Sequence, residues 1–399
     1  MDYFILFDDP KLRENLLPLT FTRPIADLRI GILKIKEKWE AYLSHKTGVL
    51  TAPYLQQKFP YNNQPAWMIN SAVFPDARLA ERILALDKTE SLWQNDTLIA
   101  FYSQDPKNCS FEKSSFKIGL TVDSPVVVLK NLWNLFQFNG DQIRADFTLL
   151  TRRRISSGCS DAYTHIYKES NVFIEPGASI RASIINAENG PVYIGKNVQI
   201  LEGNLIRGPF AICEESVLSM GSKMRGDITI GPKCKVGGEV SNSVFQGYSN
   251  KSHDGYLGNS VVGEWCNLGA NTNTSNMKNN HSSIRVWSYP KENFVDSGLQ
   301  FCGSFIGDHA KLAISTMLNS GTVVGVGANL FGEGFPKKLV PSFAWGGPTG
   351  FSSFELKKFE DAASRAMALK GESFLEVDRS ILQHVFELTR SFRIWDKDF

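Results

Sequence analysis

The sequence predicts an α/β N-terminal domain, then a parallel β-helix, then a short helical tail. The first observation behind this is a strict six-residue spacing of aliphatic residues through the middle of the chain. A helix has a period of 3.6 and an ordinary strand a period of 2, so neither produces such a spacing. The second is that the flanks lack it: strand-like apolar runs alternate with helical spacing before it, and only helical spacing follows it.

The six-residue repeat runs without a slip through eight consecutive positions: Ile194, Ile200, Ile206, Ile212, Leu218, Met224, Ile230 and Val236. A second run of the same step comprises Ile306, Leu312, Leu318, Val324 and Leu330. In a hexapeptide β-helix each coil has three short strands, each strand sends one aliphatic side chain inward, and Gly or Asn favours the tight turns. The repeat therefore predicts eight or nine coils between about residues 166 and 335.

The repeat is interrupted at residues 187–191, 242–256 and 274–302. Insertions into a solenoid project as loops from one face, where binding sites are common. We therefore look for functional residues at the interruptions.

Before the repeat, residues 4–7, 97–102 and 125–129 are predicted strands, and residues 24–42 turn into an amphipathic helix. A connecting helix begins near residue 131. This alternation is typical of an α/β domain.

After the repeat, residues 353–369 and 378–389 have helical apolar spacing, with Ser and Asp as expected N-caps. The resulting division gives residues 1–155 to the α/β domain with its connecting helix, 156–335 to the β-helix and 336–399 to the helical tail.

Composition excludes several classes of protein. The 43 basic and 41 acidic residues give a net charge of +2, so no nucleic-acid or anionic-membrane partner is indicated. The six cysteines form no CxxC pair and no metal-ligand spacing, and we predict no metal site. The amino terminus lacks the features of a secretory signal, and no apolar run approaches the ~18–20 residues of a membrane span. We expect a cytoplasmic protein.

The most specific motif lies at the second interruption, where the chain reads Lys251-Ser-His253-Asp-Gly-Tyr256-Leu-Gly258. Asn267 follows fourteen residues after His253, and Asn276 nine residues after that. This pattern resembles the bifunctional bacterial family that acetylates glucosamine 1-phosphate and then uridylylates the product, and more closely the shortened variant of that family. The resemblance implies a left-handed β-helix behind a reduced nucleotidyltransferase-like domain, and a product that feeds UDP-N-acetylglucosamine.

The resemblance also implies roles for single residues. His253 would be the general base that removes a proton from the sugar amine as the amine attacks the thioester of acetyl-CoA. The residue type suits this step, because an ammonium is no nucleophile and an imidazole accepts protons near neutral pH. Glu239, shortly before His253, would hydrogen-bond the imidazole and fix its tautomer.

The remaining positions of the motif would contact the two substrates. By the resemblance, Tyr256 and Asn267 hold the sugar phosphate and amine, and Asn276 orders the loop. Ala270 and Ser315 match positions along which the pantetheine arm of acetyl-CoA passes.

Phosphate binding departs from the family pattern. Arg225 lies near the phosphate-binding Arg of the family once a two-residue gap is allowed, but a nearby family Lys is replaced by Ser241 or Ser243. Lys223 or Lys251 would then supply the missing positive charge.

The N-terminal domain matches its family only in part. Pro18-Leu19-Thr20 and the following Arg23-Pro24 fit the second half of the nucleotidyltransferase signature. The Gly-rich phosphate loop is replaced by 6–11, which carries two carboxylates, and the Lys expected after Pro24 is Ile25. Arg13 or Arg23 would meet a UTP phosphate if the domain is active, with Mg²⁺ on the triphosphate; a structural role is the alternative.

The resemblance implies a homotrimer with acetyl-CoA between neighbouring subunits. Three other readings stay open: an acetyltransferase for a different amino sugar or nucleotide-linked amino sugar, a non-catalytic sugar-nucleotide scaffold or sensor, and a zinc carbonic anhydrase on the same solenoid. The last needs three histidines at a subunit interface, and the repeat between about residues 166 and 335 contains His253, His281 and His309.

Overall fold

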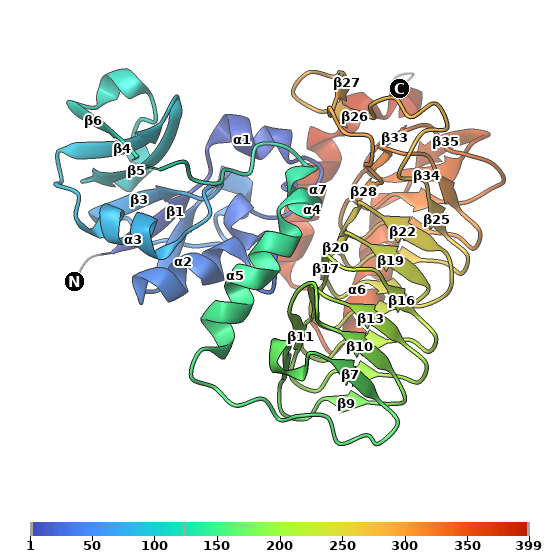
Figure 1. Ribbon diagram of the computed structural model, residues 1–399. Helices are drawn as coiled ribbons and strands as arrows, with labels where there is room; N and C mark the ends of the chain where they lie inside the picture. The colour runs from blue at the N-terminus through green and yellow to red at the C-terminus, as the bar shows by residue number, and fades with distance from the viewer. Residues whose placement is uncertain (1–2, 123, 397–399) are drawn as a thin grey trace. The chain divides into compact units, whose positions relative to one another are not determined.

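The computed structural model describes residues 3–122 and 124–396 (Figure 1). The chain forms two compact units. Unit 1 comprises residues 1–28 and 33–132, and unit 2 comprises residues 29–32 and 133–399. The connecting helix, predicted to belong to the N-terminal domain, therefore lies in the unit of the β-helix.

Unit 1 is built on one mixed sheet with the strand order β2-β1-β3-β5-β4-β6. Its strands are β1 (Phe4–Phe7), β2 (Thr47–Leu50), β3 (Ala66–Asn70), β4 (Glu90–Gln94), β5 (Thr97–Ser103) and β6 (Ile118–Thr121). The central strand β1 is parallel to β2 and β3, whereas β5 is antiparallel to β3 and β4. Every residue of β1 is buried, as its uninterrupted apolar sequence predicts for a central parallel strand.

Three α-helices complete unit 1: α1 (Pro10–Asn15), α2 (Ile35–Leu43) and α3 (Ala77–Leu84). The strands predicted at 4–7 and 97–102 are confirmed as β1 and β5. The strand predicted at 125–129 is wrong, because that segment contributes only one isolated bridge, from Val128 to Val73. Its apolar residues pack without extending the sheet.

Unit 2 is a parallel β-helix whose coils present three faces, each an almost entirely parallel sheet. The six-stranded face consists of β7 (His165–Tyr167), β10 (Ile184–Asn186), β13 (Leu205–Arg207), β16 (Lys223–Met224), β19 (Glu239–Ser241) and β22 (Tyr256–Gly258). The nine-stranded face consists of β8 (Val172–Ile174), β11 (Val192–Ile194), β14 (Phe210–Ile212), β17 (Ile228–Ile230), β20 (Val244–Gly247), β23 (Val261–Glu264), β28 (Phe305–Ile306), β31 (Val323–Val324) and β33 (Leu339–Val340).

The ten-stranded face completes the prism. It consists of β9 (Ser179–Ile180), β12 (Gln199–Ile200), β15 (Val217–Leu218), β18 (Lys235–Val236), β21 (Asn250–Lys251), β24 (Asn267–Leu268), β29 (Lys311–Leu312), β32 (Asn329–Leu330), β34 (Ala344–Gly347) and the antiparallel β35 (Gly350–Ser353). A parallel pair, β25 (Asn273–Thr274) and β30 (Met317–Leu318), follows β22 in the coil order. Because the nine-stranded face contributes one strand to each coil, the described residues form nine coils, as the repeat predicts.

All thirteen repeat residues of the two predicted runs are buried in one continuous core inside the prism. Two of the predicted interruptions are confirmed. Residues 187–191 form a loop between β10 and β11, and residues 275–302 leave the prism to form the hairpin of β26 (Arg285–Ser288) and β27 (Asn293–Asp296).

The interruption predicted at 242–256 is wrong, because this segment forms a regular coil containing β20 and β21. Its inward positions are Phe245 and Lys251, which continue the buried row from Val240 before it to Leu257 after it. The spacing of four residues from Val236 to Val240 and the lysine at an aliphatic position hide the period in the sequence.

Helices cover part of the prism. Helix α5 (Asn139–Thr151), preceded by α4 (Asn134–Gln137), packs on the nine-stranded face, where Ile143 joins Ala211 and Cys213 in a small core. In the tail, α6 (Leu356–Ala368) is anchored by Phe359, whose ring contacts His309 and Phe343.

Helix α7 (Glu376–Leu388) follows α6 and starts two residues before the predicted position. Asp378 is not its N-cap but its third residue, and its carboxylate accepts a hydrogen bond from the Leu375 N–H (3.0 Å). In the part of the chain that is described, no helix is long and apolar enough to cross a bilayer.

Candidate active site at one corner of the β-helix

Three of the predicted site residues lie on one corner of the prism, where the ten-stranded face turns into the six-stranded face. We call the stacked turns 252–255, 269–272 and 313–316 the His253 corner. The Asn271 N–H donates to the Asp254 carbonyl (2.9 Å), and the Ser315 N–H donates to the Ala270 carbonyl (2.8 Å). Successive coils are spaced as neighbouring strands are, about 4.8 Å apart. His253, Ala270 and Ser315 therefore lie on three successive turns of one corner.

The corner is open on the side of His253. The His253 side chain is exposed, as is Ser315, and Ala270 is half-buried. Ser315 has a left-handed backbone (φ 60°), and its hydroxyl accepts a hydrogen bond from the Asn271 side chain (3.2 Å). Because residue 270 is an alanine, no long side chain projects between the turns of His253 and Ser315.

Lys251 does not lie where its predicted role requires. It occupies an inward position of the core, and its side chain is only 1% exposed. Its ammonium donates to the carbonyls of Gly237 (3.2 Å) and His253 (2.9 Å). Burial lowers the pKa of Lys251 to about 8. In this arrangement Lys251 supports the turn of His253 from inside and does not offer its charge to a substrate phosphate.

Tyr256 and Asn276 are brought together. The Asn276 Nδ2 donates to the Tyr256 hydroxyl (2.9 Å) and to the Asn259 Oδ1 (2.8 Å). This pairing ties the start of the hairpin insertion to β22, the strand that follows the His253 turn. Burial raises the pKa of Tyr256, and the nearby Glu239 acts in the same direction whereas Arg225 opposes it.

Glu239 is paired with Arg225 and not with His253. The Arg225 guanidinium donates to the Glu239 Oε1 at 2.9 Å, and the two side chains are 61% and 36% exposed. In the strand pairing Glu239 lies beside Tyr256, so its carboxylate projects from the six-stranded face. The prediction that Glu239 fixes the His253 tautomer does not fit this geometry.

Asn267 lies apart from Tyr256. It is exposed on the ten-stranded face, where it pairs with Asn250 and Lys311. Tyr256 projects from the six-stranded face, so one chain does not bring these two predicted substrate contacts together.

The six-stranded face holds a groove of about 550 Å³. Three cations line it, Arg207, Lys223 and Arg225, together with Glu239 and apolar side chains from lower coils. Sequence reasoning missed Arg207. The signal was present, because Arg207 and Arg225 are 18 residues apart, which is one coil of three six-residue steps.

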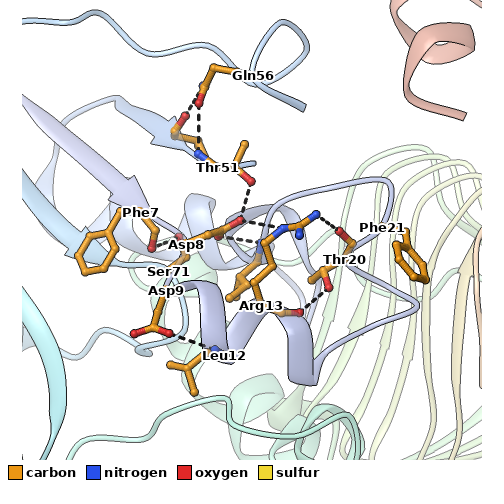
Figure 2. A network of polar contacts seen from close by, with 12 residues as sticks. Phe7, Asp8, Asp9, Leu12, Arg13, Thr20, Phe21, Thr51, Gln56 and Ser71 are labelled. Atoms are coloured by element: carbon orange, nitrogen blue, oxygen red, sulfur yellow. Dashed lines mark hydrogen bonds and ion pairs between the residues drawn. The ribbon is translucent and has the colours of Figure 1, made fainter. Parts of the chain in front are cut away.

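In unit 1, the segment that replaces the Gly-rich loop is filled by its own carboxylates (Figure 2). Asp8 is buried and accepts hydrogen bonds from the Thr51 hydroxyl (2.6 Å) and the Ile25 N–H (3.1 Å). Burial raises the pKa of Asp8 to about 6. Asp9 caps α1 by accepting from the Leu12 N–H (3.1 Å).

The two arginines predicted to meet a nucleotide are engaged by the protein itself. The Arg13 guanidinium donates to the Thr20 carbonyl (2.5 Å) and to the Tyr54 hydroxyl (2.7 Å), and lies 3.7 Å from the Asp8 carboxylate. Arg23 is 3% exposed and pairs with Asp27 at 3.6 Å. Figure 2 shows Arg13 joined to Asp8 and Thr20 within the loop. Both arginines hold this loop together and do not face an open phosphate site.

Metal ligands do not converge. Among the described residues, no group of three or more His, Cys, Asp or Glu side chains lies close enough to hold a metal ion. His309 is buried, with its ring beside those of Trp265 and Phe359. A three-histidine interface site that includes His309 does not fit this packing.

Comparison with known proteins agrees with the architecture. Residues 4–155 match the family model of sugar nucleotidyl transferases. The matched segment covers unit 1 and the connecting helix, although the phosphate loop is replaced as described above.

Curated relatives extend the comparison. The chain is 31% identical to the bifunctional protein GlmU of Rippkaea orientalis over 27% of this chain and 26% of the relative. It is 31% identical to a bifunctional sugar-1-phosphate nucleotidylyltransferase/acetyltransferase of Sulfurisphaera tokodaii over 36% and 35%. It is 25% identical to the uncharacterized acetyltransferase YaiX of Escherichia coli O6:K15:H31 over 44% and 74%.

The chain thus covers about a quarter to a third of the length of the first two relatives. The resemblance indicated by the sequence motifs is confirmed, at low identity and over part of the chain. A solved structure, the polySia specific acetyltransferase NeuO, aligns at 13% identity and a TM-score of 0.28, over 49% of this chain and 85% of its own.

Proposed function

We propose that this protein transfers the acetyl group of acetyl-CoA to the amine of an amino-sugar 1-phosphate, with glucosamine 1-phosphate as the acceptor. The observation that carries the proposal is the stacking of His253, Ala270 and Ser315 on three successive turns of one corner. A base and two small residues on one line suit a thioester arm that runs along the coils to the proton acceptor.

The chemistry needs one proton acceptor and no redox partner. The amine nitrogen attacks the thioester carbonyl, the N–C bond forms, and the C–S bond breaks to release the thiolate of CoA. The exposed His253 imidazole takes the proton that the amine loses and passes it to the leaving thiolate. Acetyl transfer of this kind uses no metal ion.

The six-stranded face offers the contacts for the sugar phosphate. Arg207, Lys223 and Arg225 supply three positive charges to the groove. To bind a phosphate, Arg225 must release its ion pair with Glu239. Both side chains are partly exposed, so a phosphate can reach the pair and replace the carboxylate. Tyr256, which lies beside the groove residue Glu239 in the strand pairing, and its partner Asn276 would add polar contacts for the sugar.

A homotrimer completes the proposal. Tyr167, Ile184 and Leu205 are 45%, 44% and 47% exposed on the six-stranded face, which suits contact with a neighbouring copy. In such an assembly the Asn267 of one copy, on its ten-stranded face, would complete the site beside the Tyr256 of another. Light scattering of the full chain tests this: we expect the mass of three chains, and the mass of a single chain would contradict it.

Unit 1 has a structural role in this proposal and no uridylyl transfer. What supports this is that Asp8, Arg13 and Arg23 are engaged with the loop that would otherwise receive the triphosphate. Pyrophosphate release from UTP and N-acetylglucosamine 1-phosphate tests it, and turnover above the rate without enzyme would contradict it.

The acceptor is tested by thiol release from acetyl-CoA with a panel of amines: glucosamine 1-phosphate, glucosamine 6-phosphate, glucosamine and a UDP-linked amino sugar. We expect turnover with glucosamine 1-phosphate that exceeds the others at least tenfold. If another amine of the panel is preferred, the proposed acceptor is wrong and the proposed acetyl transfer still holds. No thiol release with any amine favours the scaffold or sensor reading.

A further inference from the structure

A cavity of about 920 Å³ lies at the end of the β-helix opposite its first coil. Its walls come from the β26–β27 hairpin, residues 337–341 at β33, residues 347–351 at the β34–β35 turn, and residues 392–395 of the tail. We call it the terminal pocket. None of the residues assigned above to acetyl transfer lines it.

The terminal pocket is basic. Lys278, Arg285, Lys337 and Lys338 line it, and none of its described lining residues is acidic. Burial lowers the pKa of Lys338, and the charges of Lys278 and Arg285 lower it further, as expected for cations gathered in one place. Hydrogen bonds from the Gly298 N–H (2.9 Å) and the Ser283 hydroxyl (2.7 Å) lower the pKa of Asp296, and the nearby charges of Lys278 and Arg285 lower it further.

The cations are held in place by backbone carbonyls. The Lys338 Nζ donates to the Arg285 carbonyl (2.7 Å), and the Lys278 Nζ donates to the Ser283 carbonyl (2.6 Å). An ammonium has three N–H donors, so such anchoring leaves donors for a ligand. The Arg285 guanidinium donates to the Phe294 carbonyl (2.5 Å), which fixes it along the hairpin.

Aromatic rings line the same cavity: Trp287, Phe294, Phe351, Phe392 and Trp395. The Trp287 ring packs edge-on against Phe294 with centroids 5.2 Å apart, and its buried Nε1 donor has no hydrogen-bond partner among the described residues. The rings therefore give the cavity apolar walls beside its cations.

We propose that the terminal pocket binds a phosphorylated nucleoside. Lysine and arginine donors would hold the phosphates by charge-assisted hydrogen bonds, and the base would lie against the aromatic rings. The volume lies within the range of sites for small ligands of this size. A sugar phosphate alone would use the cations and leave most of the aromatic surface uncovered.

Two sources supply this chemistry: a free nucleotide such as UDP, or the phosphorylated adenosine of coenzyme A. The second source rests on the proposed acetyl transfer, and the first does not. Calorimetric titration of the full chain with coenzyme A and, separately, with UDP distinguishes them. Adenosine, uridine and inorganic phosphate serve as probes that carry only half of the recognised chemistry.

We expect micromolar to submillimolar binding of coenzyme A or UDP, and binding at least tenfold weaker for the three half probes. The double variant Lys337→Ala, Lys338→Met should weaken binding of the preferred nucleotide at least tenfold. The matched control is Lys291→Ala, an exposed lysine in the turn of the same hairpin that does not line the pocket. It should change binding less than twofold.

Two results would overturn the proposal: no binding of either nucleotide at millimolar concentration, or equal binding by the double variant and the control. Circular dichroism confirms that the double variant is folded, and Lys337→Ala alone, an exposed position, provides a second variant if it is not. Because calorimetry needs no turnover, failure of acetyl transfer leaves the UDP titration interpretable, and failure of the pocket leaves thiol release measurable.

Discussion

The ammonium of Lys251 donates a hydrogen bond to the carbonyl oxygen of His253 across 2.9 Å, from inside the prism to the turn above it. A second bond, to the Gly237 carbonyl (3.2 Å), links the turn of His253 to the turn of the preceding coil. A charged group at an aliphatic position of a solenoid core has a desolvation cost. Here it stabilises the backbone that carries the candidate base.

Replacing Lys251 by Met should change stability in a pH-dependent way. Burial lowers the pKa of Lys251 from 10.5 to about 8, so between about pH 8 and 10.5 the unfolded chain binds a proton that the folded chain has released. The free energy of unfolding of the wild type therefore rises with pH in this window, and the variant lacks this gain. From pH 7.5 to 9.5, we expect the free energy of unfolding of the wild type to rise by about 2 kcal/mol relative to that of Lys251→Met.

Chemical denaturation at the two pH values measures this difference. Lys235→Met, at an exposed position on the neighbouring strand β18, is the control and should show no such shift. A difference that is the same at both pH values for Lys251→Met would contradict the burial of its charge.

Tyr256 and Asn276 should act as one unit. Because their side chains share a 2.9 Å hydrogen bond, Tyr256→Phe and Asn276→Ala each remove the same interaction. We expect each single variant to lower kcat/KM for the amine about five- to tenfold, and the double variant to lose little more than the larger single effect. Losses that multiply would mean that the pair is not coupled, and Tyr248→Phe, at a different corner, serves as the control.

Asp8 should make unit 1 less stable as the pH rises. Burial raises its pKa from 3.8 to about 6, so between about pH 4 and 6 the folded state keeps a proton that the unfolded chain has released. Its contribution to the free energy of unfolding is largest below about pH 4 and is lost as the pH rises through 6. Relative to Asp8→Asn, the wild type should lose about 2 kcal/mol between pH 4.5 and 7.5.

The matched control for this experiment is Asp9→Asn, one residue later, where Asn caps α1 as well as Asp does. Its difference from the wild type should stay nearly constant over the same range. A constant difference for Asp8→Asn as well would show that the Asp8 carboxyl is ionised and solvated.

Arg393 should hold the tail segment that lines the terminal pocket. Its fully buried guanidinium lies 4.0 Å from the centre of the Phe386 ring and bonds to Asp396 (2.9 Å) and the Thr389 hydroxyl (3.2 Å). Removing one partner of such a buried network costs about 3–5 kcal/mol. We expect Arg393→Met to speed amide exchange in residues 386–396 and leave the core strands protected, with the exposed Arg390→Met as control. Unchanged exchange in both variants would contradict this role.

The β-helix could be predicted because its signal is periodic: one inward side chain every six residues is visible without any knowledge of contacts. The inward position of Lys251 could also have been predicted, because it lies six residues before the buried Leu257. Its motif neighbours His253 and Tyr256 instead favoured the prediction of a substrate contact. The ion pair of Glu239 and Arg225 depends on strand register across coils, which the local motif does not encode.

The terminal pocket could not be predicted from the sequence. Its cations and rings come from residues 278 to 395 and meet only because the hairpin insertion and the tail fold back over the last coil. Similarly, the sequence shows that Asp8 and Asp9 replace a phosphate loop. It does not show that Arg13 is engaged by Thr20 and Tyr54, or Arg23 by Asp27, because these contacts depend on how the loop packs.

The central claim, that acetyl transfer takes place at the His253 corner, is tested most directly by the rate of thiol release from acetyl-CoA with glucosamine 1-phosphate for the wild type and His253→Ala. His165→Ala, an exposed histidine on the first coil, is the control. The account predicts a loss in kcat of about 10²-fold or more for His253→Ala, in the range of a missing general base, and less than a twofold change for the control. Equal rates for all three proteins would contradict it.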